Sequence, residues 1–457
     1  MDGYEARVSM LHVEESPHHS RLSPTFARAL TQCREAASPV ATGAISGVVG
    51  LRFDVSGLEL PIGATVEVLD PSNPLLGEVV AVGEHGVSCM PLGDVRGLRV
   101  GGRVGGSEKP ASVWVGPQLL GRVIDALGQP LDGLGPITGL TRVALHGEPP
   151  HPMRRARIST PMSLGIRCWD TMVPAGRGQR VGVFAGSGVG KSTLLGMVAR
   201  NTAADVNVVA LIGERGREVR EFVEADLGPE GLARSVLIVA TSDAPALVRF
   251  RAAFVATRIA EYFRDLGNDV MLMMDSLTRF CMAQREIGLS AGEPPTSRGY
   301  PPSVFSLLPR LLERAGTAEV GSITGLYTVL VDGDDHNEPI SDAVRSILDG
   351  HVVLSRRLAH ANHYPAVDVL ASVSRVASAV TTSEQRALTS QLRQLLAAEA
   401  EAKDLIEIGA YVAGANPLVD RAVALHDPIQ SFLRQDVDER CEAATSFERL
   451  AQILSLR

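Results

Sequence analysis

The run Val181-Gly-Val-Phe-Ala-Gly-Ser-Gly-Val-Gly-Lys-Ser-Thr193 lies near the middle of the sequence. Its apolar beginning, Val181–Phe184, predicts a strand. Glycine or alanine fills four of the six positions from Ala185 to Gly190, so backbone N–H groups can approach phosphate oxygens with little side chain between them. The residues that follow give a helix an apolar face: Leu194, Leu195 and Val198. A strand, a glycine-rich turn and a helix in this order predict a phosphate-binding loop.

The end of the run predicts how a triphosphate is held. Lys191 is expected to reach the β- and γ-phosphates and the Ser192 hydroxyl to bind Mg²⁺, at the positive end of the following helix. Ala185 replaces the first glycine of the strict pattern, with Gly186 beside it. A dinucleotide-binding fold is the alternative glycine-rich pattern, but it requires no Lys-Ser pair. We therefore expect a nucleoside triphosphate with Mg²⁺, held by Gly186, Ser187, Gly188, Val189, Gly190, Lys191, Ser192 and Thr193.

Composition narrows the class of protein. A chain of 457 residues is too long for one ordinary core and predicts about two to four domains. The formal net charge of −8 argues against a general nucleic-acid binder, although a local basic channel stays open. No apolar run approaches the roughly 20 residues that span a bilayer, and Met1–Ser20 lacks the apolar core of a secretory signal. The cysteines are scattered, odd in number and never spaced as CxxC: Cys33, Cys89, Cys168, Cys281 and Cys441. We expect a soluble protein of the reducing cytoplasm without zinc or disulfides.

The first two regions of the chain differ in pattern. Residues 1–40 combine a polar tail with apolar residues at helical spacing, Leu22, Phe26, Leu30 and Cys33, which predict a short amphipathic helix. Binding a partner is the favoured role for this helix and packing on the body of the protein is the alternative. Residues 41–108 contain short β-like runs, which predict a small β-barrel: Ala44–Val49, Ala64–Leu69, Gly77–Val82, Gly86–Met90 and the segment near Arg99–Val104. Phe53 is the single aromatic residue from Ala41 to Gly106, which favours a structural barrel over a base-stacking one.

The remaining two regions predict an α/β core and a helical end. In residues 109–380, apolar strands alternate with helical patterns, which is typical of a mostly parallel sheet with helices on both faces. The predicted strands are Val181–Phe184, Asn207–Ile212, Ser235–Ala240, Val270–Met274 and Ile323–Val331. In residues 381–457, an amphipathic helical pattern begins with Leu388, Leu392, Leu395 and Leu396. This helical region is either a cap on the core or a moving, partner-facing element.

Two predicted strand ends carry residues that could hydrolyse a triphosphate. Asp275 follows the apolar run Val270–Met274 and is expected to join the Mg²⁺ shell. Glu214 follows Asn207–Ile212 and could orient the attacking water, while Arg215 could contact the γ-phosphate. For the neighbouring charged residues Arg217, Glu218 and Arg220, we favour a solvated surface cluster.

A resemblance to a known protein family is clearest in the stretch that begins at Asp275. The stretch Asp275-Ser-Leu-Thr-Arg-Phe-Cys-Met-Ala-Gln-Arg-Glu-Ile-Gly-Leu-Ser-Ala-Gly-Glu-Pro-Pro-Thr-Ser-Arg-Gly-Tyr-Pro-Pro-Ser-Val-Phe305 closely resembles the type III secretion ATPases. These are the flagellar and injectisome export motors, relatives of the catalytic subunits of rotary ATP synthases. Further matches are Gly121–Asp132, Asn362–Asp368 and Ser372–Arg375. The resemblance covers roughly Ala41 to the C-terminus and implies a RecA-like P-loop core between a small β-barrel and C-terminal helices.

The resemblance also implies roles for single residues. Lys191 and Ser192 match the phosphate-loop lysine and the Mg²⁺-binding hydroxyl, and Asp275 matches the Mg²⁺-linked carboxylate. Glu214 matches the catalytic glutamate and Arg215 its γ-phosphate partner. Three further residues complete the implied set: Arg279 near the phosphates, Tyr364 stacked on adenine, and Arg375 as an arginine finger supplied to the neighbouring subunit. The structural alternatives are packing for Tyr364 and ion pairing for Arg279 and Arg375.

The family implies a homohexameric ring that drives flagellar protein export with ATP and Mg²⁺. Such a ring is cytoplasmic, peripheral at the inner face of the membrane, and stands below the export gate. The implied partners are a stator-like negative regulator on the N-terminal helix, a stalk-like protein in the pore, the gate proteins, and export substrates with their chaperones. We expect the loop Glu293–Pro302 to face the pore, and no direct contact with nucleic acid.

Three alternatives to flagellar export stay open. Asp335–Ile340 and Gln430–Leu433 resemble the flagellar branch, with an injectisome ATPase as the first alternative. A rotary ATP synthase catalytic subunit and a ring-shaped nucleic-acid translocase are the others. One chain carrying both Glu214 and Arg375 favours a ring of identical subunits over a synthase.

Overall fold

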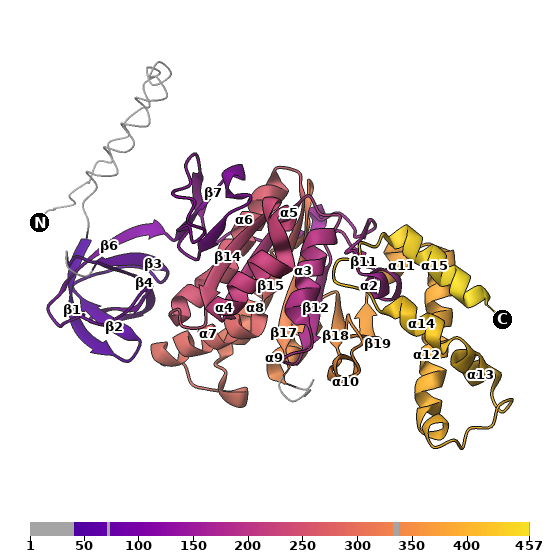
Figure 1. The fold of residues 1–457 in the computed structure, drawn as a ribbon. Coiled ribbons are helices and arrows are strands. Elements are labelled where there is room, and N and C mark those ends of the chain that lie inside the picture. The colour runs from indigo at the N-terminus through magenta and orange to yellow at the C-terminus, as the bar shows by residue number, and fades with distance from the viewer. Residues whose placement is uncertain (1–40, 71–73, 332–337, 457) are drawn as a thin grey trace, which may run out of the picture.

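The computed structural model describes residues 41–70, 74–331 and 338–456. Figure 1 shows three parts in a row: a β-barrel, a central sheet flanked by helices, and a group of C-terminal helices. The helix predicted around Leu22–Cys33 lies outside the described residues. Among the helices of the described ranges, none is long and apolar enough to cross a membrane.

The predicted barrel is confirmed as a closed, antiparallel one with strand order β1-β2-β5-β4-β3-β6. Its strands are β1 (Ala41–Val49), β2 (Arg52–Ser56), β3 (Ala64–Val68), β4 (Leu75–Gly83), β5 (Gly86–Pro91) and β6 (Arg103–Pro110). Because side chains alternate along a strand, Phe53 and Val55 of β2 point inward and pack with Val66 and Cys89. Strand β2 was not predicted, since only the short turn Gly50-Leu51 separates it from β1.

A large, mostly parallel sheet forms the centre, as predicted. Its strand order is β19-β18-β12-β17-β15-β13-β14-β8. The strands are β8 (Val123–Asp125), β12 (Arg180–Ala185), β13 (Val206–Glu214), β14 (Ser235–Thr241), β15 (Asp269–Asp275), β17 (Ser322–Leu330), β18 (Gly350–Leu354) and β19 (Val367–Ser374). The pairs from β8 to β18 are parallel, whereas β19 runs antiparallel to β18 and β16 (Gly316–Thr317) antiparallel to β17. Parallel strands end at one edge, so the residues that follow them gather there.

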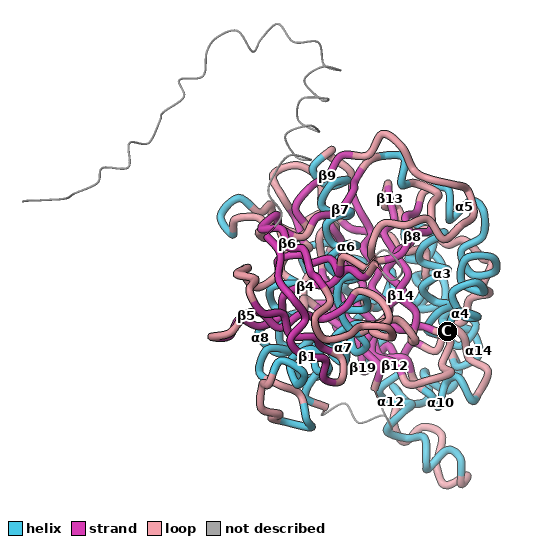
Figure 2. Tube along the Cα trace, turned by 90° about the vertical axis from the view of Figure 1, so that its left-hand side faces the viewer, coloured by secondary structure: helices cyan, strands magenta, loops and turns pink. Residues whose placement is uncertain are grey.

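Helices cover both faces of this sheet, because successive side chains of its buried strands point to opposite sides. On one face, Val208 and Ala210 of β13 pack with α6 (Ala246–Asp265), α7 (Leu277–Ala291) and α8 (Pro302–Leu312). On the other face, Val209 and Leu211 pack with α2 (Arg167–Met172) and α3 (Lys191–Asn201). Seen from the barrel side, Figure 2 shows the strands at the centre with helices around them.

The C-terminal part is helical, as predicted. It comprises α11 (Ala377–Val380), α12 (Ser383–Glu407), α13 (Pro417–Ala424), α14 (His426–Leu433) and α15 (Ala443–Ser455). Thr382 and Gln385 form a capping box at the start of α12, which satisfies backbone N–H groups that the helix leaves free. Leu392 and Leu395 are buried in the same apolar cluster as Trp169 of α2, and each such leucine contributes about 1.5–3 kcal/mol of hydrophobic stabilisation. The helices are therefore packed onto the α3 side of the core.

Short elements complete the described chain: β7 (Ser112–Val115), β9 (Thr141–Ala144), β10 (Pro161–Met162), β11 (Ala175–Gly176), α4 (Gly216–Glu221), the π-helix η4 (Phe222–Leu227), α5 (Gly228–Ala233), α9 (Pro339–Ile347), α10 (Arg356–His360) and the 3₁₀ turns η2 (Pro117–Leu119), η3 (Pro152–Arg154) and η5 (Ser297–Gly299).

Candidate active site

The phosphate loop, Ala185–Ser192, connects β12 to α3 as the sequence predicts. Gly188 and Gly190 have φ angles of 74° and 85°, in the left-handed region that glycine adopts without steric cost. Gly190 is the N-cap of α3, so the loop leads directly into the helix, whose first residue is Lys191. Backbone N–H groups and a helix N-terminus therefore meet at one place, which is a suitable geometry for an anion.

Lys191 brings the two predicted carboxylates together. Its Nζ donates to Glu214 Oε1 at 3.2 Å and contacts Asp275 Oδ1. Asp275 is 2% exposed at the end of β15, and Glu214 ends β13 beside it in the sheet. Burial opposes the charged form of Lys191, but the carboxylates of Asp275 and Glu214 raise its pKa above the ordinary value, so the ammonium is retained.

Glu214 has the environment of a base. Burial is the main factor that raises the pKa of Glu214, the nearby charge of Asp275 adds to this effect, and Lys191 only partly opposes it. A carboxylate with a raised pKa accepts a proton more readily, which suits a residue that activates water. Glu218, predicted to belong to a solvated surface cluster, is near enough to interact with Glu214 and also raises the pKa of Glu214. The sequence carried no signal for this contact, because Glu214 ends a strand and Glu218 lies in the helix that follows.

The residues for Mg²⁺ are of the right chemical kind. Magnesium prefers oxygen ligands and usually binds only one or two carboxylates of a protein. The phosphate oxygens of the substrate and water supply its other ligands. Ser192 lies exposed at the start of α3, and Asp275 presents a carboxylate beside Lys191. A third oxygen, Thr328 Oγ1 of β17, donates to Asp275 Oδ1 at 2.7 Å. Thr328 was not predicted, because it lies inside an apolar strand and only the register of the sheet reveals the contact.

Arg279 lies next to the catalytic glutamate candidate. Its backbone N–H donates to the side chain of Ser276, which caps α7. Gly213 has a φ of 72°, and a Cβ there would lie 3.0 Å from Arg279 Cβ, so the stem of the arginine packs directly on the residue before Glu214. Arg279 Nε is buried and has no hydrogen-bond partner among the described residues. The structure therefore places Arg279 at the site.

Arg215 points away from Lys191. Its side chain is 77% exposed and lies 3.6 Å from Glu218. The other arginines of this segment are exposed as well and pair with glutamates one turn further on, Arg217 with Glu221 and Arg220 with Glu224. The structure thus leaves Arg215 outside the cluster of Lys191, Glu214 and Asp275.

Tyr364 stands at the phosphate loop although it is far away in sequence. A Cβ on Gly190 would lie 3.2 Å from Tyr364 Cε1, so the ring lies against the last glycine of the loop. The tyrosine is 40% exposed, which leaves ring surface for a ligand. Its carbonyl accepts a hydrogen bond from Gln435 N at 3.0 Å, which ties this position to the segment after α14.

Arg375 lies at the opposite edge of the sheet. Strand β19 pairs Val367 with Leu354 at the phosphate-loop edge and Ser374 with Gly350 at the other edge. A strand rises about 3.3 Å per residue, so Arg375 lies more than about 20 Å along the sheet from the start of β19. Its guanidinium donates to Arg345 O at 3.2 Å. Within one subunit, Arg375 is therefore not brought together with Lys191.

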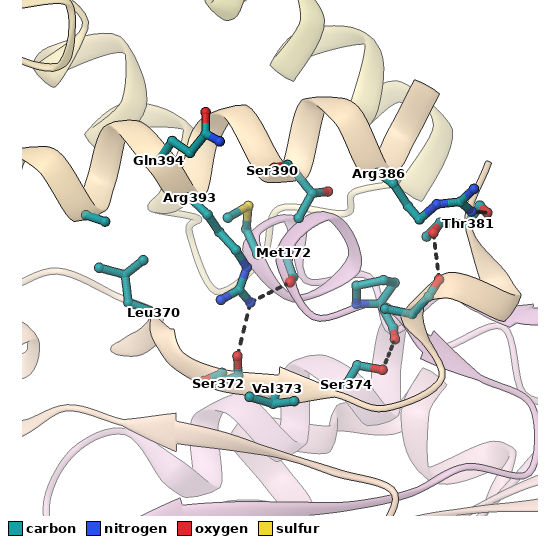
Figure 3. Close-up of a pocket in the computed structure, with 14 residues that line it drawn as sticks. Met172, Leu370, Ser372, Val373, Ser374, Thr381, Arg386, Ser390, Arg393 and Gln394 are labelled. Atoms are coloured by element: carbon teal, nitrogen blue, oxygen red, sulfur yellow. Dashed lines mark hydrogen bonds between the residues drawn. The ribbon is translucent and has the colours of Figure 1, made fainter. Parts of the chain in front are cut away.

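A cavity of about 620 Å³ opens along the same strand, between β19 and α12. Figure 3 shows Arg393 of α12 reaching across it to donate to Met172 O and Ser372 O, both at 3.0 Å. Arg386, Thr389 and Gln394 also line it. Ser374, the residue before Arg375, lines the cavity, whereas no residue of the phosphate loop does.

Comparisons with known proteins identify the family of this chain. Residues 165–374 match the ATP synthase alpha/beta family, nucleotide-binding domain, and residues 381–452 match the T3SS EscN ATPase C-terminal domain. The flagellum-specific ATP synthase of Bacillus subtilis (strain 168) is 50% identical over 417 residues, which cover 91% of this chain and 94% of that protein. The type 3 secretion system ATPase of Xanthomonas euvesicatoria is 50% identical over 413 residues, covering 90% and 93%.

A solved structure gives the same result. The assembled ATPase EscN from the enteropathogenic E. coli type III secretion system superimposes with a TM-score of 0.87 and 45% identity, over 90% of this chain and all of that one. EscN in complex with its central stalk EscO gives a TM-score of 0.85 over the same 90% of this chain. The match extends from the barrel through the sheet to the C-terminal helices, and on this basis the chain belongs to the type III secretion ATPases, within the wider ATP synthase alpha/beta family.

Proposed function

We propose that this protein hydrolyses ATP with Mg²⁺ to drive type III export of flagellar proteins, as a homohexameric ring at the cytoplasmic face of the export gate. The observation that carries the proposal is the meeting of Lys191, Glu214 and Asp275 behind the phosphate loop. The flagellum-specific ATP synthase of Bacillus subtilis, which is 50% identical to this chain in sequence, supports the flagellar branch.

The geometry suits in-line hydrolysis of the γ-phosphate. The loop N–H groups and Lys191 bind the phosphates. Glu214 accepts a proton from the attacking water, while the water oxygen forms a bond to the γ-phosphorus and the bond between that phosphorus and ADP breaks. Ser192 and Asp275 would hold Mg²⁺, which neutralises charge on the β- and γ-phosphates when bound. Arg279 stands next to Glu214 and stabilises the same phosphates.

Three further residues complete the proposal. Tyr364 stacks on adenine above Gly190. Arg375 serves the site of the neighbouring subunit, a role supported by its place at the far edge of its own sheet. Arg215 has to leave Glu218 before it can contact a γ-phosphate.

The proposed assembly includes several partners. A stalk-like protein occupies the pore, and EscN in complex with its central stalk EscO supports this part. The loop Glu293–Pro302 between α7 and α8 faces that pore, and residues 1–40 bind a negative regulator. The ring delivers export substrates and their chaperones to the gate proteins, peripheral to the membrane. The proposed domains are 1–40, 41–108, 109–380 and 381–457.

An injectisome ATPase is the second candidate, because the Xanthomonas euvesicatoria type 3 secretion system ATPase is equally identical to this chain. The deciding experiment is a chromosomal Glu214→Gln replacement in the source organism, scored by electron microscopy for flagellar filaments. Loss of filaments at normal protein level supports flagellar export. Normal filaments contradict it and direct attention to proteins secreted by an injectisome. Stimulation of hydrolysis by RNA would instead favour a nucleic-acid translocase.

A further inference from the structure

A threonine in the central sheet lies between the two strands that deliver the phosphate site. Thr328 belongs to β17, which pairs with β12 on one side and β15 on the other. Its register partner on β12 is Val183, two residues before the phosphate loop, and its neighbour Tyr327 pairs with Met274. The side chain of Thr328 is completely buried.

Thr328 and Asp275 share one face of the sheet. In β17, Ile323, Tyr327 and Val329 belong to the apolar cluster on the α6 side, whereas Leu326 belongs to the cluster on the α3 side. Because side chains alternate, Thr328 points to the α3 side with Leu326. In β15, Met271 and Met273 belong to the α3-side cluster, and Asp275 follows in the same phase. The hydroxyl and the carboxylate are therefore placed on the face where Lys191 begins α3.

The contact itself is specific to one carboxylate oxygen. Thr328 Oγ1 donates to Asp275 Oδ1 at 2.7 Å, and Lys191 Nζ contacts the same Oδ1. The hydroxyl also has a backbone acceptor in range, Met274 O, but at 3.4 Å. A hydroxyl has one proton to donate, and a short bond to a charged acceptor is the stronger of the two. Rotation of the carboxylate away from this orientation would break both contacts to Oδ1.

We propose that Thr328 is a positioning residue that fixes the carboxylate of Asp275 for Mg²⁺-bound nucleotide. The inference rests on the proposed function and assigns Thr328 a task in it. With Oδ1 held by Thr328 and Lys191, the other oxygen of Asp275 is the one left for the shell of the metal. Partners that orient a metal-binding group in this way typically change metal affinity about tenfold or more when removed.

The same strand contains a matched control. Thr324 is four residues earlier, on the same face, and is also completely buried. Its hydroxyl accepts from Gly178 N at 2.9 Å, a backbone contact of a different loop. Thr328→Val and Thr324→Val thus remove the same hydroxyl from the same kind of site, but only the first touches Asp275.

The test measures how strongly Mg²⁺ tightens nucleotide binding. Fluorescently labelled ADP is titrated onto the full chain in EDTA and again in Mg²⁺, for the wild type, Thr328→Val, Thr328→Ser and Thr324→Val. Thr328→Val should match the wild type in EDTA but lose about tenfold of the Mg²⁺-dependent tightening. Thr328→Ser keeps the hydroxyl and should restore the tightening, and Thr324→Val should behave as the wild type. If Thr328→Val does not fold, Thr328→Ala takes its place.

Two results would overturn the inference: equal tightening in Thr328→Val and the wild type, or an equal loss in Thr324→Val. A wild type that binds nucleotide without any effect of Mg²⁺ would instead contradict the proposed function, and with it the task assigned to Thr328. The two failures are therefore distinguished by which protein departs from expectation.

Discussion

Glu214 and Asp275 share Lys191 but differ in what they can do. Asp275 is fixed by Lys191 and Thr328, whereas Glu214 has a raised pKa and a partly open position at the strand end. We predict that Glu214→Gln leaves the affinity for ATP within about threefold, because the contact between Lys191 and Asp275 is retained. The same change should lower turnover at least about a hundredfold, because it removes the base. Nucleotide titration and phosphate release measure the two effects. The control is Glu221→Gln, which changes a glutamate of an exposed pair with Arg217. Rapid turnover by Glu214→Gln would contradict the assignment of Glu214 as the base.

Tyr364 provides a second prediction at this scale. Its ring lies against Gly190 with surface exposed, and stacking on a base is worth about 1–3 kcal/mol. Tyr364→Ala should therefore weaken ATP binding by roughly five- to hundredfold, while Tyr364→Phe keeps it. Inorganic tripolyphosphate, which has no base, should bind both variants and the wild type equally. A matching loss for tripolyphosphate would show that the tyrosine supports the phosphate loop and not the base.

At the scale of elements, a largely buried contact between Glu78 and Arg251 joins the barrel to the core. Glu78 of β4 is 13% exposed and its Oε2 lies 3.8 Å from Nη1 of Arg251 on α6, which also donates to Ser112 O at 2.8 Å. Burial raises the pKa of Glu78 from 4.5 to about 7, and Arg251 only partly opposes this. The folded state thus binds a proton at Glu78 more tightly than the unfolded chain does. The stabilisation that this proton provides is complete below the unfolded pKa of Glu78 and disappears as the pH rises through about 7.

The corresponding prediction concerns the pH dependence of unfolding. The stability of the wild type relative to Glu78→Gln should fall by up to about 3 kcal/mol between pH values near 4.5 and above 7. Chemical denaturation across this range measures the difference. Glu67→Gln, at an exposed position of the neighbouring strand β3, should show no such trend. A constant difference between wild type and Glu78→Gln would mean that Glu78 titrates normally.

Local patterns predicted most of the elements but few of the contacts between them. The apolar run Val181–Phe184 became β12 with one residue added at each end, and the glycine loop after it needed no tertiary information. Strand β8 has only three residues and exists through its pairing with β14, far along the chain. Thr328 and Asp275 are 53 residues apart, so only the sheet register brings them together. The roles of the site residues stay predictions for the experiments above.

At the scale of the whole molecule, we predict that one subunit alone is an incomplete enzyme. Arg375 and the phosphate loop lie at opposite edges of the sheet, so each proposed site takes its lysine from one subunit and its arginine from the next. Lys191→Ala and Arg375→Ala should each lower turnover about a thousandfold or more when alone. In mixed rings, an Arg375→Ala subunit beside a Lys191→Ala subunit forms an intact site, so about a quarter of all sites should recover in a random equimolar mixture.

Steady-state phosphate release from the mixture checks this complementation. The control mixes Lys191→Ala with the Lys191→Ala/Arg375→Ala double variant, which can form no intact site. Mixed rings that assemble but stay inactive would contradict the trans role of Arg375.

The reversed direction of β19 has a mechanical consequence. One continuous hydrogen-bonded sheet carries the phosphate loop at one edge and Arg375 at the other. A rotation of this sheet about an axis through its middle moves the two edges in opposite directions. In the proposed closed ring, a rotation that moves one subunit's loop away from the preceding arginine also moves its own arginine away from the following loop. Neighbouring sites of the proposed ring would then open and close together, so the topology of the chain itself couples each site to the next.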